Sequence, residues 1–147
     1  EDIQVALHQI FTNVRLKSLI EVRDFDCLPF KYILSPVAFL TGLVSEKAIR
    51  KKLINEFISW SAEERVLWNQ KASILDVNQS GPRHRTFFDW IKWVGEFAIQ
   101  GLEKRGYNET KYFSEYFNNT IKNGPLGIQA QKEFKSSGLS LGEFIFN

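Results

Sequence analysis

The stretch between Thr86 and Gly106 constrains the fold most, because it is too apolar for a helix on the surface. Its large side chains recur at spacings of three and four residues: Phe87, Trp90, Ile91, Val94, Phe97 and Ala98. Thr86 and Asp89 match a capping box at one end, and Gly106 is typical of the residue that closes a helix at the other. We therefore expect a helix in the core here.

A second capping box predicts where another helix starts. Ser61 and Glu64 are spaced so that a hydroxyl and a carboxylate each satisfy a free backbone N–H group. The helix should run toward Ile74 and stop in the polar loop 78–85.

The preceding segment, 30–44, is apolar but contains a proline. We expect a short extended entry and then a helix in which Ser35 is the cap, Pro36 occupies the first position and Gly42 marks the end. The alternative is a single kinked helix. A further helix should open at Ser45. Its predicted buried stripe comprises Ile49, Leu53, Ile54 and Phe57.

Both ends of the chain also show helical periodicity. An amphipathic helix is expected from Ile3 to near Asp24, followed by an extended connector, and another should begin at Asn108 or Thr110 and end at Asn123. The tail after Gln129 is a possible short helix. It is so apolar that it should dock on this domain or on a partner.

Length and composition indicate one folded domain spanning 1–147. The chain has 147 residues, of which 44% are hydrophobic and 14% aromatic, and this content is incompatible with intrinsic disorder. The predicted fold is all-α, a compact bundle of about five to six helices.

Several kinds of chemistry lack a recognisable signature. Cys27 is the single cysteine and only His8 and His84 accompany it, so we expect no disulfide, no metal and no catalytic triad. No glycine-rich loop matches a nucleotide-binding motif, and we expect no cofactor and no enzymatic activity. No apolar run reaches the roughly 18 residues that span a bilayer, which predicts a soluble intracellular protein without membrane contact.

The most basic surface should lie on the helix that opens at Ser45. Lys47, Arg50 and Lys51 could grip phosphate groups of duplex DNA, and a solvated helix face is the alternative interpretation. The predicted nucleic-acid-binding residues are Lys31, Lys47, Arg50, Lys51, Arg83 and Arg85, the last two joining if the polar loop folds back beside the helix.

A protein partner is a second possibility. Trp60 sits at a helix end beside a cap rather than inside a regular apolar stripe, so we expect it to be exposed. Together with Phe144 and Phe146 in the tail, it is a predicted partner-binding residue.

The segment Arg50–Ala72 resembles the second half of an HMG box. Leu53 and Phe57 would close the second helix of that box, and Trp68 would anchor the third. The resemblance extends over about 28–94 to the α-box of the fungal mating-type α1 family, with 95–147 as a C-terminal helical extension. The residues that carry this likeness are Phe39, Gly42, Val44, Leu67-Trp68-Asn69 and Phe88-Asp89-Trp90-Ile91.

This resemblance implies a nuclear, DNA-binding transcription regulator that acts with a MADS-box transcription factor as its protein partner. The alternative is a helical interaction or adaptor module that does not bind nucleic acid. Its motivation is a net charge of only +2 and the apolar tail.

Overall fold

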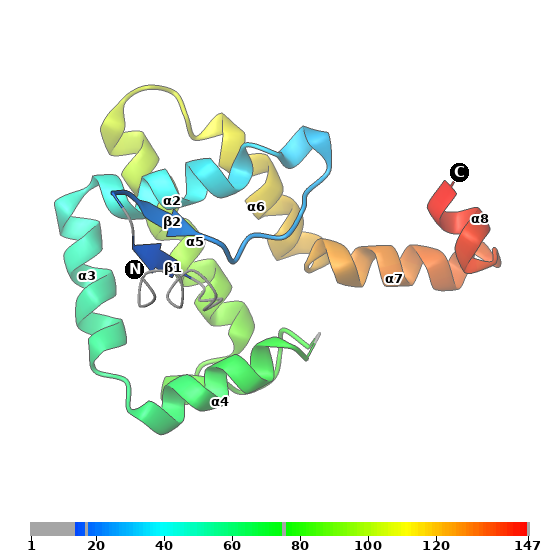
Figure 1. Cartoon of the computed structure of the whole chain (residues 1–147), viewed down its shortest axis with the longest axis horizontal. Helices are drawn as coiled ribbons and strands as arrows, with labels where there is room; N and C mark the ends of the chain where they lie inside the picture. The colour runs from blue at the N-terminus through cyan, green and yellow to red at the C-terminus, as the bar shows by residue number, and fades with distance from the viewer. Residues whose placement is uncertain (1–13, 17, 75, 147) are drawn as a thin grey trace, which may run out of the picture. The chain divides into compact units, whose positions relative to one another are not determined.

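The computed structural model describes residues 14–16, 18–74 and 76–146 and confirms the all-α class (Figure 1). The chain divides into two compact units, Glu1–Ile33 and Leu34–Asn147, which we describe separately. The expected single domain over 1–147 stays a prediction. The helices of the second unit are α2 (Ser35–Ser45), α3 (Lys47–Ile58), α4 (Ala62–Ala72), the 3-10 turn η2 (Pro82–His84), α5 (Phe87–Arg105), α6 (Lys111–Asn123), α7 (Leu126–Ser137) and α8 (Leu141–Phe146).

The first unit contains an antiparallel hairpin of β1 (Val14–Leu16) and β2 (Ile20–Val22), followed by the 3-10 turn η1 (Phe30–Tyr32). The helix predicted to continue to Asp24 is therefore wrong over the described residues, and 1–13 lie outside them. In the hairpin Val14 pairs with Val22 and Leu16 with Ile20. Apolar residues two positions apart and β-branched side chains favour strands. The sequence predicted a helix because a segment this short also fits the helical period.

In the second unit, α2 crosses α5 at a contact made by small residues. A methyl group added to Gly42 would overlap the backbone of Ala98, and one added to Gly101 would overlap the backbone of Gly42. Only glycine allows this backbone contact. Gly42 therefore lies inside α2 at the crossing, and the prediction that it ends the helix is wrong.

Ser35 has a different role from the predicted cap. It is the first residue of α2, after Leu34 at the cap position, and its hydroxyl donates a 2.7 Å hydrogen bond to the carbonyl oxygen of Tyr112. The side chain is 1% exposed. This hydrogen bond links α2 to the start of α6.

The core beside this crossing combines residues of α2, α5 and α6. Phe113 and Phe117 stack with their ring centroids 5.3 Å apart and face the crossing. The buried members of the core are Ala38, Leu43, Ala98, Leu102, Phe113 and Phe117.

Local capping signals fix the starts of α4 and α5 as predicted. Both Ser61 with Glu64 and Thr86 with Asp89 form complete capping boxes, and Gly106 closes α5 with a φ of 73°. α3 begins one residue after Glu46, whose side chain accepts from the Ala48 N–H group.

Ile54 on α3 is 59% exposed, so its predicted burial is wrong. It follows Leu53 by one residue, and this turns it about 100° away from the buried face.

None of the described helices is by itself long and apolar enough to cross a membrane. By length and composition alone, Phe30–Ser45 and Lys47–Ile58 meet that requirement as a pair, with a bend of 91° between them.

Candidate functional site

A cluster of aromatic rings joins α3, α4 and α5. Its members are Phe57, Trp60, Trp68, Phe87, Trp90, Trp93 and Phe97. Trp90 is 1% exposed, and its indole N–H group donates to the carbonyl oxygen of Pro82 at 3.2 Å. Trp68 stacks on Phe87 with the ring centroids 4.3 Å apart. This part of the unit is held by interlocked rings.

Trp60 belongs to the interior of this cluster. It is 7% exposed, so the prediction of an exposed, partner-binding Trp60 is wrong. The capped turn at Ser61 folds α4 back, which brings Trp60 against Trp90 and Trp68 with centroids 5.1 and 5.5 Å apart. Its indole N–H group donates to the Glu56 carboxylate at 3.3 Å.

Cationic side chains lie over the rings of this cluster. The Arg85 guanidinium lies 4.8 Å from the Trp90 ring centre and 5.9 Å from that of Trp93. The Lys52 ammonium lies 5.3 Å from the Phe97 ring centre. The faces of aromatic rings attract cations, and this stabilises each exposed pair by about 0.5–1 kcal/mol. These contacts give Arg85 a structural role.

Lys47, Arg50 and Lys51 lie within the first five residues of α3. Lys47 and Lys51 are exposed, whereas Arg50 donates a hydrogen bond to the carbonyl oxygen of Val44. Arg83 lies beyond the other end of α3, where it donates to the carbonyl oxygen of Ser59 at 2.8 Å. A helix of this length is about 18 Å long, so the predicted basic residues of this unit do not form one compact patch.

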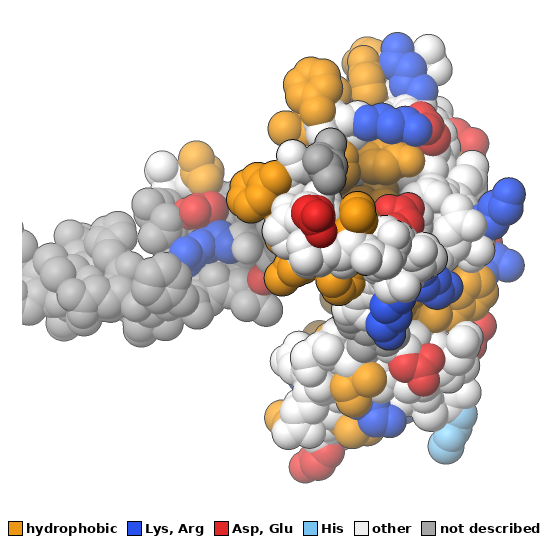
Figure 2. Space-filling model, turned by 90° about the vertical axis from the view of Figure 1, so that its right-hand side faces the viewer, with side chains coloured by type: hydrophobic (Ala, Val, Ile, Leu, Met, Phe, Trp, Pro, Cys, Tyr) orange, Lys and Arg blue, Asp and Glu red, His pale blue; other side chains and the backbone are white. Residues whose placement is uncertain are grey.

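Arg83 is held in place by neighbouring groups. Besides the Ser59 backbone it contacts the Ser59 hydroxyl at 2.7 Å, and it lies 3.8 Å from a Glu64 carboxylate oxygen. Lys31 belongs to the first unit, where its ammonium lies over the Tyr32 ring at 5.1 Å. Figure 2 shows basic, acidic and hydrophobic side chains interspersed over the face it presents.

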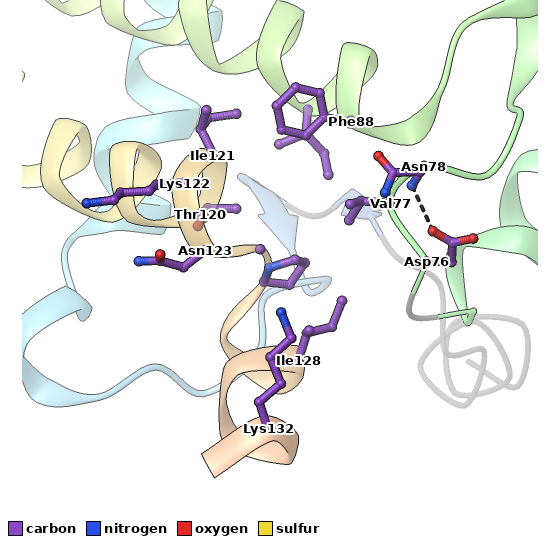
Figure 3. Close-up of a pocket in the computed structure, with 13 residues that line it drawn as sticks. Asp76, Val77, Asn78, Phe88, Thr120, Ile121, Lys122, Asn123, Ile128 and Lys132 are labelled. Carbon is purple, nitrogen blue, oxygen red and sulfur yellow. Dashed lines mark hydrogen bonds between the residues drawn. The ribbon is translucent and has the colours of Figure 1, made fainter. Parts of the chain in front are cut away.

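A pocket of about 370 Å³ lies between the loop after α4, α5, α6 and the start of α7 (Figure 3). The apolar part of its wall is half-buried and comprises Val77, Phe88, Ile91, Ile121, Pro125 and Ile128. The polar part comprises Asp76, Asn78, Thr120, Lys122, Asn123 and Lys132. A space of this size is typical of small-molecule sites.

Most polar groups on the pocket wall already have partners. The Asn78 N–H group donates to Asp76 Oδ1 at 2.9 Å, and the Thr120 hydroxyl donates to the carbonyl oxygen of Tyr116 at 2.9 Å. The Asn123 amide donates to Asn119 at 2.7 Å. Among the described residues, the Lys132 ammonium has neither a hydrogen bond nor an ion pair. No local sequence pattern indicates this pocket, because its wall combines the loop after α4 with parts of α5, α6 and α7.

Metal ligands do not gather in the described part of the chain. There, no three His, Cys, Asp or Glu side chains lie close enough together to hold an ion. The groups whose pKa is shifted belong to caps and ion pairs. Hydrogen bonds from Thr86 lower the pKa of Asp89, and a hydrogen bond from Arg105 lowers the pKa of Glu109.

The predicted partner-binding residues of the tail lie on α8. Phe144 packs against Phe134 of α7 with ring centroids 5.3 Å apart, whereas Phe146 is 90% exposed. The tail thus docks on α7 through Phe144.

Comparison with known proteins gives the chain a different set of relatives from those expected. No family model matches it. It is 31% identical over 113 residues to a chloroplastic glutamate–cysteine ligase of Nicotiana tabacum, a match that covers 74% of this chain and 21% of that protein. The like-named proteins of Solanum lycopersicum and Arabidopsis thaliana are 31% and 27% identical, over 74% of this chain and 21% and 20% of their own lengths. The chain thus spans about a fifth of these relatives.

These matches correct two predictions. The resemblance to the fungal mating-type α1 family is wrong, because the relatives found are plant ligases. The HMG-like spacing does not identify a family, because unrelated helical proteins can also have a capped turn between two helices that carry aromatic core residues. The prediction of no enzymatic activity is also contradicted, since these relatives are named as enzymes.

Proposed function

We propose that this chain is a helical segment of an enzyme of the glutamate–cysteine ligase type, which joins glutamate to cysteine. The observation that supports this function is a likeness that extends over 74% of the chain. An alignment this long includes several helices, so it does not depend on a single motif.

The packing of the second unit suggests how the segment contributes. The glycine crossing of α2 with α5 and the aromatic cluster each link helices distant in the sequence through close contacts. Close-packed interiors resist deformation. Within the larger enzyme, the segment would act as a rigid support for the parts that bind substrate.

A chimera tests this proposal. The matching segment of the tobacco ligase is replaced by this chain, and formation of the glutamate–cysteine dipeptide is followed by mass spectrometry with a nucleoside triphosphate as the energy source. We expect the chimera to retain a measurable fraction of the parent activity. A soluble, folded chimera without activity would contradict the proposal.

Two variants of the chimera provide matched controls. Gly42→Leu places a side chain into the backbone of α5, and we expect it to abolish activity. Gly127→Leu adds the same side chain at a glycine where an added methyl group would meet no atom within 4 Å, and we expect activity to persist. Equal activity in both variants would show that the packing of this unit does not matter to the enzyme.

DNA binding and the protein-interaction alternative both stay predictions. With the α-box resemblance overturned, the proposal of DNA binding depends on the basic residues at the start of α3. Lys47 and Lys51 remain exposed there.

A further inference from the structure

The geometry points to a binding site for a small zwitterion in the pocket between α5, α6 and α7: a free amino acid or a short peptide with an apolar side chain. This inference concerns a site apart from the activity proposed above and does not depend on it.

Two opposite charges lie on different sides of this pocket. Figure 3 shows Asp76 and Asn78 on one side of the pocket and Lys132 on the other, while the Lys122 side chain extends away from Val77 and Phe88. Within the described residues Asp76 and Lys132 form no ion pair with each other. A carboxylate and an ammonium group thus face one opening from two sides.

Both charged groups can still accept or donate a hydrogen bond to a ligand. Asp76 uses Oδ1 to accept the Asn78 N–H group at 2.9 Å, which fixes the carboxylate and leaves Oδ2 for a further donor. Lys132 stands on α7 one turn after Ile128, so both side chains lie on the same face of that helix. Lys132 would receive a ligand carboxylate, and Asp76 would receive a ligand ammonium group.

An apolar wall completes the pocket beside the two charges. Phe88 and Ile91 lie three residues apart on α5, and Val77 and Ile128 complete a half-buried apolar surface. The volume of about 370 Å³ lies within the range of sites that hold small molecules. A branched or aromatic amino-acid side chain would displace water from this wall on binding.

Calorimetric titration of the 147-residue chain with L-phenylalanine tests the site. N-acetylphenylalanine lacks the ammonium group, phenylalaninamide lacks the carboxylate, and glycine lacks the apolar side chain. We expect phenylalanine to bind at least about tenfold more tightly than each of the three, because each omits one interaction. Alanyl-phenylalanine in a parallel titration decides between amino acid and peptide: whichever binds more tightly is the better ligand.

Substitutions test which charged group of the ligand Lys132 and Asp76 each bind. Lys132→Ala should remove the preference for phenylalanine over its amide while keeping the preference over the acetylated form. Asp76→Asn should remove the preference for phenylalanine over the acetylated form and keep the preference over the amide. The asparagine side chain retains an oxygen that can accept the Asn78 N–H group. Lys135→Ala removes an exposed lysine of the same helix that does not line the pocket, and it should change neither preference.

Three results would overturn the proposal. They are the absence of binding up to about 10 mM phenylalanine or dipeptide, equal affinity for phenylalanine and its two blocked forms, and unchanged preferences in both Lys132→Ala and Asp76→Asn. Circular dichroism on each variant verifies that the helices remain folded.

Discussion

Gly42 and Gly101 set how closely α2 and α5 approach each other. At both positions an added methyl group would overlap backbone atoms of the opposite helix. Backbone atoms cannot move aside as the end of a flexible side chain can, so the helices themselves would have to separate. The residues packed beside the crossing, including Leu102 and Phe113, would then lose contact.

The first prediction follows from this crossing. Gly42→Ala should lower the free energy of unfolding by about 3 kcal/mol, since the methyl group has no space. Chemical denaturation followed by tryptophan fluorescence measures this change. Gly127→Ala is the control, because it lies in open space in the first turn of α7, and it should leave the stability unchanged or slightly higher. Equal effects of the two substitutions would contradict the close crossing.

Single residues show the limits of sequence interpretation. The sequence predicts a local role for Ser35, Gly42 and Trp60: a cap, a helix end and an exposed side chain. Each proved to contact a segment distant in the chain: the carbonyl oxygen of Tyr112, the backbone of α5, and Trp90. Nothing in the neighbouring sequence specifies those contacts.

The capping box of α5 gives the second prediction. Hydrogen bonds from the Thr86 side chain and backbone lower the pKa of Asp89, and the charges of Arg85 and Lys92 lower it further. A depressed carboxyl pKa stabilises the fold above the pKa of the unfolded chain, and this contribution is lost as the pH falls through the lower value of the folded state. Asp89→Asn should therefore lower Tm at pH 7, and the difference from the parent chain should shrink below about pH 4.

Thermal unfolding at a series of pH values checks this prediction. The control is Glu103→Gln, an exposed carboxyl on the same helix outside the cap. A Tm difference for Asp89→Asn that is constant from pH 7 to about pH 2 would show that the charge of Asp89 contributes nothing to the cap.

The basic residues at the start of α3 give the third prediction. If this chain binds duplex DNA, changing Lys47, Arg50 and Lys51 to Ala should weaken binding and flatten its dependence on salt. With fewer cations on the protein, fewer phosphates are neutralised, and binding releases fewer counterions from the DNA. Fluorescence anisotropy over a salt series measures both quantities. Arg83→Ala is a comparison at the other end of α3. Unchanged affinity after the triple substitution would exclude this surface as a DNA site.

Whole elements were predicted well where local signals decide them. The starts of α4 and α5 and the end of α5 depend on residues within four positions of each other, and all three are confirmed. The prediction of a helix where β1 and β2 form a hairpin is wrong. Strand pairing is decided by contacts between segments, and a short apolar window alone cannot distinguish the two structures.

For the molecule as a whole, the all-α class followed from the sequence, but the candidate site did not. The pocket depends on the turn at Gly124 and Pro125 coming close to Asp76–Asn78, two loops that share no sequence pattern. The likeness to ligases was missed for a related reason. The predicted resemblance depended on the spacing of aromatic and aliphatic residues. That spacing reflects how side chains pack in a helical core, and unrelated helical proteins have similar spacings.

The C-terminal helix α8 gives the last prediction, at the scale of the whole molecule. Leu141, Ile145 and Phe146 are 60%, 61% and 90% exposed, and the ring contact of Phe144 is with Phe134 of α7. Truncation after Ser137 removes little buried surface from the second unit. We expect the free energy of unfolding to fall by less than about 1 kcal/mol in chemical denaturation.

The same truncation in the ligase chimera tests whether α8 packs against the rest of the enzyme or belongs to the core of this chain. Exposed aromatic and aliphatic side chains grouped on one short helix are typical of a surface that another part of a protein covers. If α8 packs against the rest of the enzyme, truncation should reduce activity or solubility of the chimera while the isolated chain keeps its stability. Unfolding of the isolated chain would instead show that α8 belongs to its core, contrary to the exposure of Phe146.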